Sequence, residues 1–202
     1  MTPVKETALR HGIPVYQPVR AREASFVEEM RALEPDVMVV IAFGQILSRE
    51  LLDVPRYGCV NIHASLLPKY RGAAPIQWAV INGDRETGIT TMMMDTEMDT
   101  GDMLEKKVIA LDEKETGGSL FDRLSLLGGD LILSTLDKME AGTLVPEKQD
   151  HEKATYVKKI SKSMGDIDWT MDAAAIERLI RGLNPWPSAY TRLNGRMLNC
   201  LL

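Results

Sequence analysis

The chain has 202 residues, 45% hydrophobic and 26% charged, which is typical of a globular protein and excludes a long disordered chain. Its net charge of −5 argues against a free-standing nucleic-acid binder, because phosphate contacts require basic surface. The longest apolar run, residues 37–43, is too short to span a bilayer, and residues 1–6 form no apolar signal segment, so we expect a cytoplasmic protein without membrane association.

The first part of the chain alternates helix and strand signals. An amphipathic helix is expected where Ala24, Val27, Met30 and Leu33 share one face, and Ser48 is placed to cap a short helix. The alternation predicts an α/β protein with a mostly parallel sheet. The expected elements are a helix over 7–11, a strand over 13–16, a helix over 23–33, a strand over 37–42 buried on both faces, a helix over 48–52 and a buried strand over 58–62.

The second part adds two strands, a long helix and a hairpin. Leucines recur at helical spacing from Leu120 onward, and Gly142 is expected to end that helix. Asn194-Gly195 is a strong hairpin signal. The expected elements are a helix over 73–82, strands over 87–95 and 103–110 around a turn, a long helix that carries the stripe from Leu120 to Met139 and ends at Gly142, polar irregular chain over 143–165, a helix over 172–182, and a hairpin over 188–202.

Parallel α/β sheets place ligands beyond the carboxyl ends of their strands, so the segments after Ala42 and Ile62 are the places to look for a site. Asn61 and His63 would project together from the second of these strands. An amide donor and an imidazole could stabilise an oxyanion and move a proton. The competing interpretation is a hydrogen-bonded structural histidine beside a turn-forming asparagine.

Acidic residues gather on the turn between the two later strands. Asp95, Glu97 and Asp99 lack the full calcium-loop pattern, so we expect no metal there. The two cysteines, Cys59 and Cys200, also lack zinc-ligand spacing. One carboxylate of the turn could orient the imidazole and raise its basicity. The alternative is an ordinary solvated loop.

These two segments carry a resemblance to a known family. Asn-x-His at 61–63, SLLPKYRG at 65–72 and MDTGD at 98–102 resemble the formyltransferases that use 10-formyltetrahydrofolate as co-substrate and no metal. The resemblance implies a Rossmann-like domain and a catalytic trio of Asn61, His63 and Asp99. It also implies two folate-contacting stretches, made of Ser65, Leu66, Leu67 and Pro68, and of Phe43, Gly44, Gln45, Ile46 and Leu47.

Three segments are similar to the branch of that family that acts on methionyl-tRNA: RGAAPIQ at 71–77, DTGDML at 99–104 and NPWPSAY at 184–190. The resemblance therefore implies formylation of methionyl-initiator tRNA for translation initiation. Three alternatives stay open. The first is the same chemistry on an amino sugar or a ribonucleotide amine. The second is a folate-binding or interaction fragment without catalysis, and the third is a plain α/β domain in which His63 and Asp99 are structural.

The resemblance also sets expected domain boundaries. Residues 1–150 would form the catalytic domain without its first strand, turn and helix, 151–184 a linker and helix, and 185–202 the start of a β-rich C-terminal domain. We expect a monomeric fragment that binds tRNA weakly. It should be unstable or inactive alone, because a sheet without its first strands leaves an edge uncovered.

Overall fold

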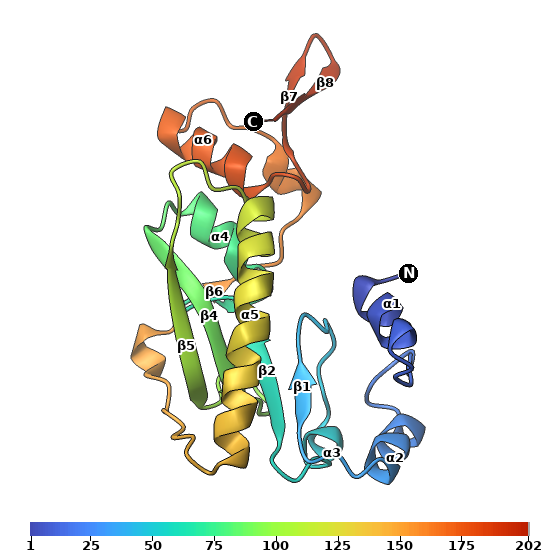
Figure 1. Cartoon of the computed structure of the whole chain (residues 1–202). Coiled ribbons are helices and arrows are strands. Elements are labelled where there is room, and N and C mark those ends of the chain that lie inside the picture. The colour runs from blue at the N-terminus through green and yellow to red at the C-terminus, as the bar shows by residue number, and fades with distance from the viewer. Residues whose placement is uncertain (202) are drawn as a thin grey trace.

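The computed structural model describes residues 1–201, and at its centre lies a four-stranded sheet with the order β1-β2-β4-β5 (Figure 1). Strand β1 pairs in parallel with β2, whereas β4 is antiparallel to both β2 and β5. The α/β class is confirmed, but this sheet is mixed and the expected predominance of parallel pairing is wrong for it. A short turn joins β4 to β5, and only an antiparallel pair can be closed that way. The strands are β1 (Met38–Val40), β2 (Cys59–His63), β4 (Glu86–Met93) and β5 (Met103–Ala110).

Two smaller sheets and six helices surround this sheet in the described residues. The pair β3 (Arg71–Gly72) and β6 (Tyr156–Val157) is parallel, and the pair β7 (Ala189–Leu193) and β8 (Arg196–Cys200) is antiparallel. The helices are α1 (Pro3–Arg10), α2 (Ala24–Ala32), α3 (Arg49–Leu52), α4 (Pro75–Ile81), α5 (Gly117–Glu140) and α6 (Ala173–Gly182), with short 3₁₀ turns at His151–Lys153 and Lys162–Gly165.

The helices expected from the sequence are all present, with ends shifted by a few residues. Ser48 caps α3 by accepting a hydrogen bond from the Leu51 amide, as its position predicts. Asp172 occupies the N-cap position of α6 but makes no side-chain cap bond there. The hairpin turn at Asn194 and Gly195 has positive φ at both residues, +49° and +75°, which is the geometry of a type I′ turn. Of this expected hairpin, Leu202 lies outside the described residues.

Two strand expectations are wrong. Residues 13–16 form no strand, and Ile13 and Tyr16 are largely exposed. The expected strand over 37–42 shrinks to three residues, and it is not buried on both faces, since Val39 is 43% exposed and Ile41 50% exposed. The reason is position, because within the described residues β1 is an edge strand that pairs only with β2. Apolar composition alone cannot reveal which strand will have two neighbours.

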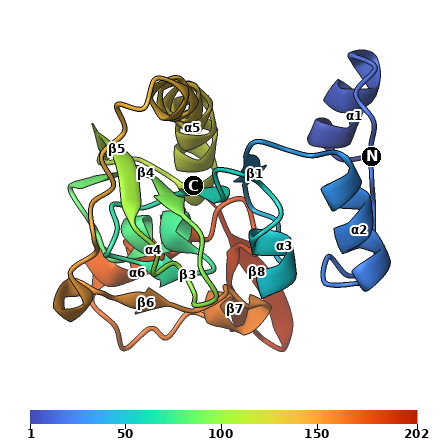
Figure 2. The same ribbon diagram turned by 90° about the horizontal axis from the view of Figure 1, so that it is seen from below.

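The main core lies between the sheet and α5, which runs along one face of the sheet (Figure 1). Leu120, Leu124 and Leu131 of α5 pack on Ile62 of β2 and Ile89 of β4. Figure 2 shows β6 on the other side of the sheet from α5. Since side chains alternate along a strand, Asn61 and His63 face away from α5, toward the side on which β6 lies.

The N-terminal helices stand apart from this core. Helix α1 has no buried residue, whereas α2 and α3 pack with Cys59 of β2 in a second apolar cluster. At the other end of the chain, Ile167, Ile176 and Ala189 join α6 to the terminal hairpin. No helix in residues 1–201 combines the length and the apolarity needed to cross a membrane.

Candidate active site

The site begins with His63, the last residue of β2, whose side chain is buried. Its Nε2 lies 2.9 Å from the carbonyl oxygen of Tyr70. A carbonyl can only accept, so Nε2 carries the proton and donates. The other ring nitrogen, Nδ1, faces the Asp99 carboxylate, with 3.7 Å between Nδ1 and Oδ1. The fold thus reserves Nδ1 as the ring atom that can take up or release a proton.

Asp99 reaches His63 from the turn between β4 and β5. The residue has φ of +54°, a left-handed conformation that costs a non-glycine residue about 1–3 kcal/mol and persists only when its surroundings enforce it. The carboxylate Oδ2 accepts a 2.8 Å hydrogen bond from the Gly72 amide. Oδ1 remains for the imidazole, so the two carboxylate oxygens have different partners.

Two glycines allow this close approach. A Cβ on Gly101 would lie 2.0 Å from the carbonyl oxygen of Met93, and a Cβ on Gly72, where φ is +113°, would lie 2.4 Å from the carbonyl oxygen of Val157. Both contacts involve backbone atoms that cannot move aside cheaply. The glycines of the two motifs are therefore required where the Asp99 turn meets β3.

Asn61 completes the group. It is half-buried in the middle of β2, and it lies on the same face of the strand as His63. Its side-chain amide carries two N–H donors that can bind a ligand. A small hollow of about 20 Å³, enough for roughly one water or one formyl-sized group, is lined by Asn61, Met92, Met94, Asp95, Glu97 and Asp99.

The structure therefore brings together the three residues expected to act together. Asp99 contacts His63 directly and shares the hollow with Asn61. Asp95 and Glu97 also line the hollow, but Asp95 is engaged locally, since its carboxylate accepts hydrogen bonds from Thr100 and from the Glu97 amide. This arrangement offers donors for a developing oxyanion beside a base that a carboxylate orients.

Part of the first expected folate stretch, Ser65 to Pro68, is buried and makes contacts within the protein. The Ser65 hydroxyl is buried and donates to the Lys69 carbonyl, and Leu67 is buried against Met92 and Met103. The Thr90 hydroxyl ties the stretch to β4, because it donates to the Ser65 carbonyl and accepts from the Leu67 amide. Leu66 and Pro68 remain half-exposed, so a ligand could reach their side chains most readily.

The second expected folate stretch, Phe43 to Leu47, follows β1. Because β1 and β2 are parallel, their carboxyl ends point to the same edge of the sheet, which puts this loop on the edge that holds Asn61 and His63. Phe43, Gly44 and Ile46 are exposed, whereas Leu47 packs into the cluster of α2 and α3. The Gln45 side chain accepts a hydrogen bond from the Ala21 amide, which anchors the loop.

Sequence reasoning missed Gln149, Tyr70 and the role of Arg71. Gln149 is buried and donates to the carbonyl oxygens of Asp99 and Gly101, at 2.8 Å in both cases. It comes from the stretch expected to be irregular and polar, where no local pattern distinguishes it from its neighbours. Arg71 belongs to the quoted motif, but nothing in the sequence indicates that its side chain would be buried.

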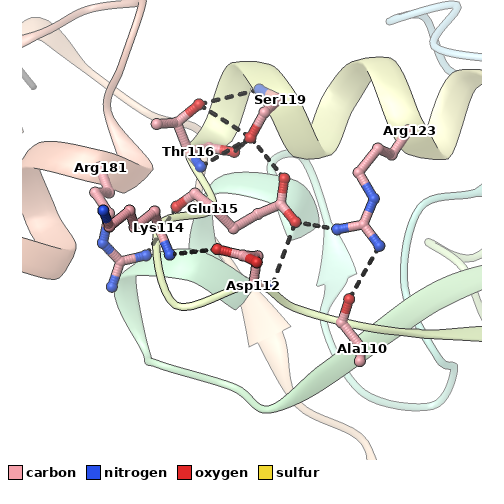
Figure 3. Close-up of polar contacts among 8 residues, drawn as sticks. All are labelled: Ala110, Asp112, Lys114, Glu115, Thr116, Ser119, Arg123 and Arg181. Carbon is pink, nitrogen blue, oxygen red and sulfur yellow. Dashed lines mark hydrogen bonds and ion pairs between the residues drawn. The ribbon is translucent and has the colours of Figure 1, made fainter.

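A much larger depression of about 500 Å³ lies elsewhere, where β5 leads into α5, and Figure 3 shows the residues around it. Glu115 is buried there, pairs with Arg123 and accepts a hydrogen bond from Ser119. This depression lies at the Ala110 end of β5, whereas Asp99 precedes the Met103 end. Size alone would select the wrong place, because the depression is an open surface feature whose polar groups already bind one another.

Two family models and several known proteins match the chain. The family model described as "Formyl transferase" matches residues 1–136, and the one described as "Formyl transferase, C-terminal domain" matches residues 159–201. The chain is 61% identical to the methionyl-tRNA formyltransferase of Agathobacter rectalis over 195 residues, which cover 96% of this chain and 63% of that protein. It is 59% identical to the enzyme of the same name from Lachnospira eligens, covering 98% and 62%.

Solved structures share the fold at lower identity. A 4-N formyltransferase from Francisella tularensis superposes with a TM-score of 0.80 at 19% identity, covering 98% of this chain and 80% of that one. HypX from Aquifex aeolicus in complex with tetrahydrofolic acid gives 0.75 at 18%, covering 90% and 32%. At such identities the likeness concerns the fold, and it confirms the Rossmann-like formyltransferase architecture expected for the catalytic part.

Proposed function

The chain belongs to the formyl transferase family, and from that premise we propose that it transfers a formyl group from 10-formyltetrahydrofolate to the amino group of methionyl-initiator tRNA. The chain spans 63% of the length of the Agathobacter relative, and the proposal depends only on residues that the chain contains. One observation carries the proposal. Asn61, His63 and Asp99 come from two separated segments, yet Asp99 contacts the His63 ring and lines one hollow with Asn61.

In the proposed reaction, the amine nitrogen forms a bond to the formyl carbon, and the bond from that carbon to the folate nitrogen breaks. Negative charge develops on the formyl oxygen, where the Asn61 amide donates a hydrogen bond. Nδ1 of His63 takes up and releases the transferred proton, and Asp99 holds the ring in place. The proton lost by the attacking amine passes through this pair to the departing folate nitrogen, so atoms and charges balance.

For the folate, we propose contacts with both stretches expected from the sequence, Ser65 to Pro68 and Phe43 to Leu47. The exposed Phe43 and Ile46 offer apolar surface for a flat ring, and Leu66 and Pro68 offer it from the opposite stretch. HypX, a protein that shares the fold, was solved in complex with tetrahydrofolic acid, which supports a folate as the ligand.

We propose methionyl-tRNA as the acceptor, because relatives that are 61% and 59% identical to the chain are named methionyl-tRNA formyltransferases. We propose that the reaction takes place in the cytoplasm, where an initiator tRNA is used. We also propose that the chain is a monomer. The net charge of −5 leaves the tRNA little electrostatic attraction, so binding by this chain should be weak and strongly dependent on salt.

We propose that the catalytic part extends through residue 150, because residues 147–149 are tied to the sheet. Glu147 pairs with Met103, and Gln149 binds the Asp99 turn. Residues 151–184 then form a linker with α6, and 185–202 begin the C-terminal part. The terminal hairpin supports this division, since it is a separate two-stranded sheet.

The direct test is a formyl-transfer assay with the purified chain, 10-formyltetrahydrofolate and three acceptors: methionyl-tRNA, an amino-sugar nucleotide and a ribonucleotide amine. Transfer to methionyl-tRNA would support the proposal and would overturn the expectation, drawn from the sequence, of a chain that is inactive alone; Asp99→Asn should then abolish most of that transfer. Transfer only to another acceptor would replace the proposed substrate. Binding of folate without transfer to any acceptor would contradict the catalytic proposal.

A further inference from the structure

Asp99 sits in a backbone conformation that its own sequence does not favour, so neighbouring groups must hold it there. In the structure the Gln149 side chain binds the backbone on both sides of this conformation. The side-chain amide nitrogen of Gln149 donates to two carbonyl oxygens of the turn, those of Asp99 and Gly101. These two bonds bracket the residue that carries the carboxylate, and Gln149 itself is buried.

The orientation of the Gln149 amide is fixed from the other side. Its oxygen accepts from Nε and Nη2 of Arg71, at 3.0 and 2.7 Å. Reversing the amide would place its NH₂ against the guanidinium and its oxygen against two carbonyls, so only one orientation satisfies all four bonds. The Arg71 side chain thereby determines which face of Gln149 meets the Asp99 turn.

Arg71 is unusual because it is 1% exposed and yet pairs with no carboxylate among residues 1–201. Its remaining N–H groups approach His151 and Tyr156, which are neutral acceptors. A buried guanidinium is costly unless its donors are satisfied, and here Gln149 supplies the shortest contacts. An acidic side chain in place of Gln149 would neutralise the charge better, but it could not donate to the turn.

We infer that Gln149 is a positioning residue, which clamps the turn so that the Asp99 carboxylate meets both the Gly72 amide and the His63 ring. Asp99 is the group that would act on substrate, and Gln149 acts only through it. The inference rests on the proposed site, but it concerns geometry that can be measured without catalysis.

The test uses amide hydrogen exchange in the full chain, with Gln149→Glu as the key variant. This change keeps an acceptor for Arg71 and removes the donor to the turn. The Gly72 amide donates to Asp99 Oδ2, whereas the amides of Arg71 and Ala73 donate to the carbonyls of Thr155 and Val157. These neighbours are internal controls, because they report on the β3–β6 pairing and not on Asp99.

We expect Gln149→Glu to accelerate exchange at Gly72 about tenfold or more, with Arg71 and Ala73 changed less than about twofold. Asp99→Ala should reproduce the effect at Gly72 without touching Gln149. Gln77→Glu, the same chemical change at a half-buried position on α4, should leave all three amides unchanged. Unchanged exchange at Gly72, or equal acceleration at all three amides, would overturn the clamp.

A kinetic arm separates this inference from the proposed function. Gln149→Glu should lower kcat about tenfold or more with KM for the folate nearly unchanged, and it should add nothing to Asp99→Asn. An additional loss in the Asp99→Asn background would show that Gln149 acts by another route. A wild-type chain without turnover would contradict the proposed function, and the exchange result would still decide whether Gln149 clamps the turn.

Discussion

The two polar clusters at opposite ends of the β4–β5 hairpin are built in opposite ways. Around Glu115 each buried ion has a partner of opposite charge. Glu115 pairs with Arg123 (Figure 3). Arg181 pairs with Glu177 and also donates to the Glu115 carbonyl. Such a cluster is complete without any ligand. Its role is to join the start of α5 to β5 and α6.

The cluster at Asp99 is incomplete by comparison. Nδ1 of His63 and Oδ1 of Asp99 stay 3.7 Å apart, beyond hydrogen-bond distance, and the half-buried Asn61 lines the hollow beside them. The buried Arg71 is neutralised by no acid within residues 1–201. The comparison teaches that complete ion pairs indicate a structural role. Polar groups that stay beyond hydrogen-bond distance of each other beside a hollow indicate a site for chemistry.

The largest effect that separates the clusters should be on rate. Asn61→Ala or His63→Ala should lower kcat by about 10² to 10³, the usual cost of losing one oxyanion donor or its proton carrier. The melting temperature should change little for the half-buried Asn61→Ala, whereas His63→Ala also removes the buried hydrogen bond to the Tyr70 carbonyl and should lower it. Steady-state kinetics with methionyl-tRNA measure this, and a rate loss below about tenfold would remove the residue from the mechanism.

The Glu115 cluster should show the reverse profile. Glu115→Ala should lower the free energy of unfolding by about 1–3 kcal/mol, since Ser119 and Arg123 lose a buried acceptor while Arg123 can still reach water. The remaining activity of the folded protein should be unchanged. Denaturant unfolding measures the loss, with the exposed Glu113→Ala as the matched control. A rate effect without a stability effect would reverse the roles assigned to the two clusters.

Acid should weaken the contact between Glu105 of β5 and the C-terminal part of α5, which holds this helix to the sheet. Burial raises the pKa of Glu105, but hydrogen bonds from Lys138, Thr135 and Ser134 outweigh it and hold the pKa below its usual value. The stabilising contribution is therefore present above about pH 4.5, the unfolded value, and is lost as pH falls below it. Unfolding measured from pH 6 to 3 should show a smaller fall for Glu105→Gln than for the wild type. An equal fall in both would exclude this carboxylate.

The smallest expected effect concerns Cys59, which lies two residues before Asn61 on β2. Burial raises the pKa of the Cys59 thiol to about 11, with the Asp53 charge acting in the same direction. At pH 8 only about one thiol in a thousand would be ionised, and the thiolate is the reactive form. Thiol labelling should therefore modify the half-exposed Cys200 long before Cys59. Equal labelling would mean that the apolar cluster around Cys59, which includes residues of α2 and α3, opens readily.

How much the sequence could predict differs along the chain. The leucine stripe of α5 and the Asn-Gly hairpin are local signals, and both elements were predicted correctly. The failure at residues 13–16 and the exposure of Val39 depend on which strands become neighbours, and that is decided by contacts distant in sequence. Periodicity reports the faces of an element, but it cannot report the element's place in the sheet.

The site divides in the same way. The pairing of His63 with Asp99 was expected from the resemblance of two motifs, and the 3.7 Å contact agrees with it. Gln149 could not be predicted, because its importance arises only when the chain returns from residue 142 to lie beside β3 and the Asp99 turn. Burial of Ser65 and Leu67 was likewise invisible in the motif that contains them.

The most direct test of the central claim is a double-mutant cycle on kcat/KM for His63→Ala and Asp99→Ala. Residues that act as one unit are strongly non-additive. The double variant should therefore lose about as much transfer activity as His63→Ala alone. Losses that multiply would show that the imidazole and the carboxylate act independently, and the account of a single converged site would be contradicted.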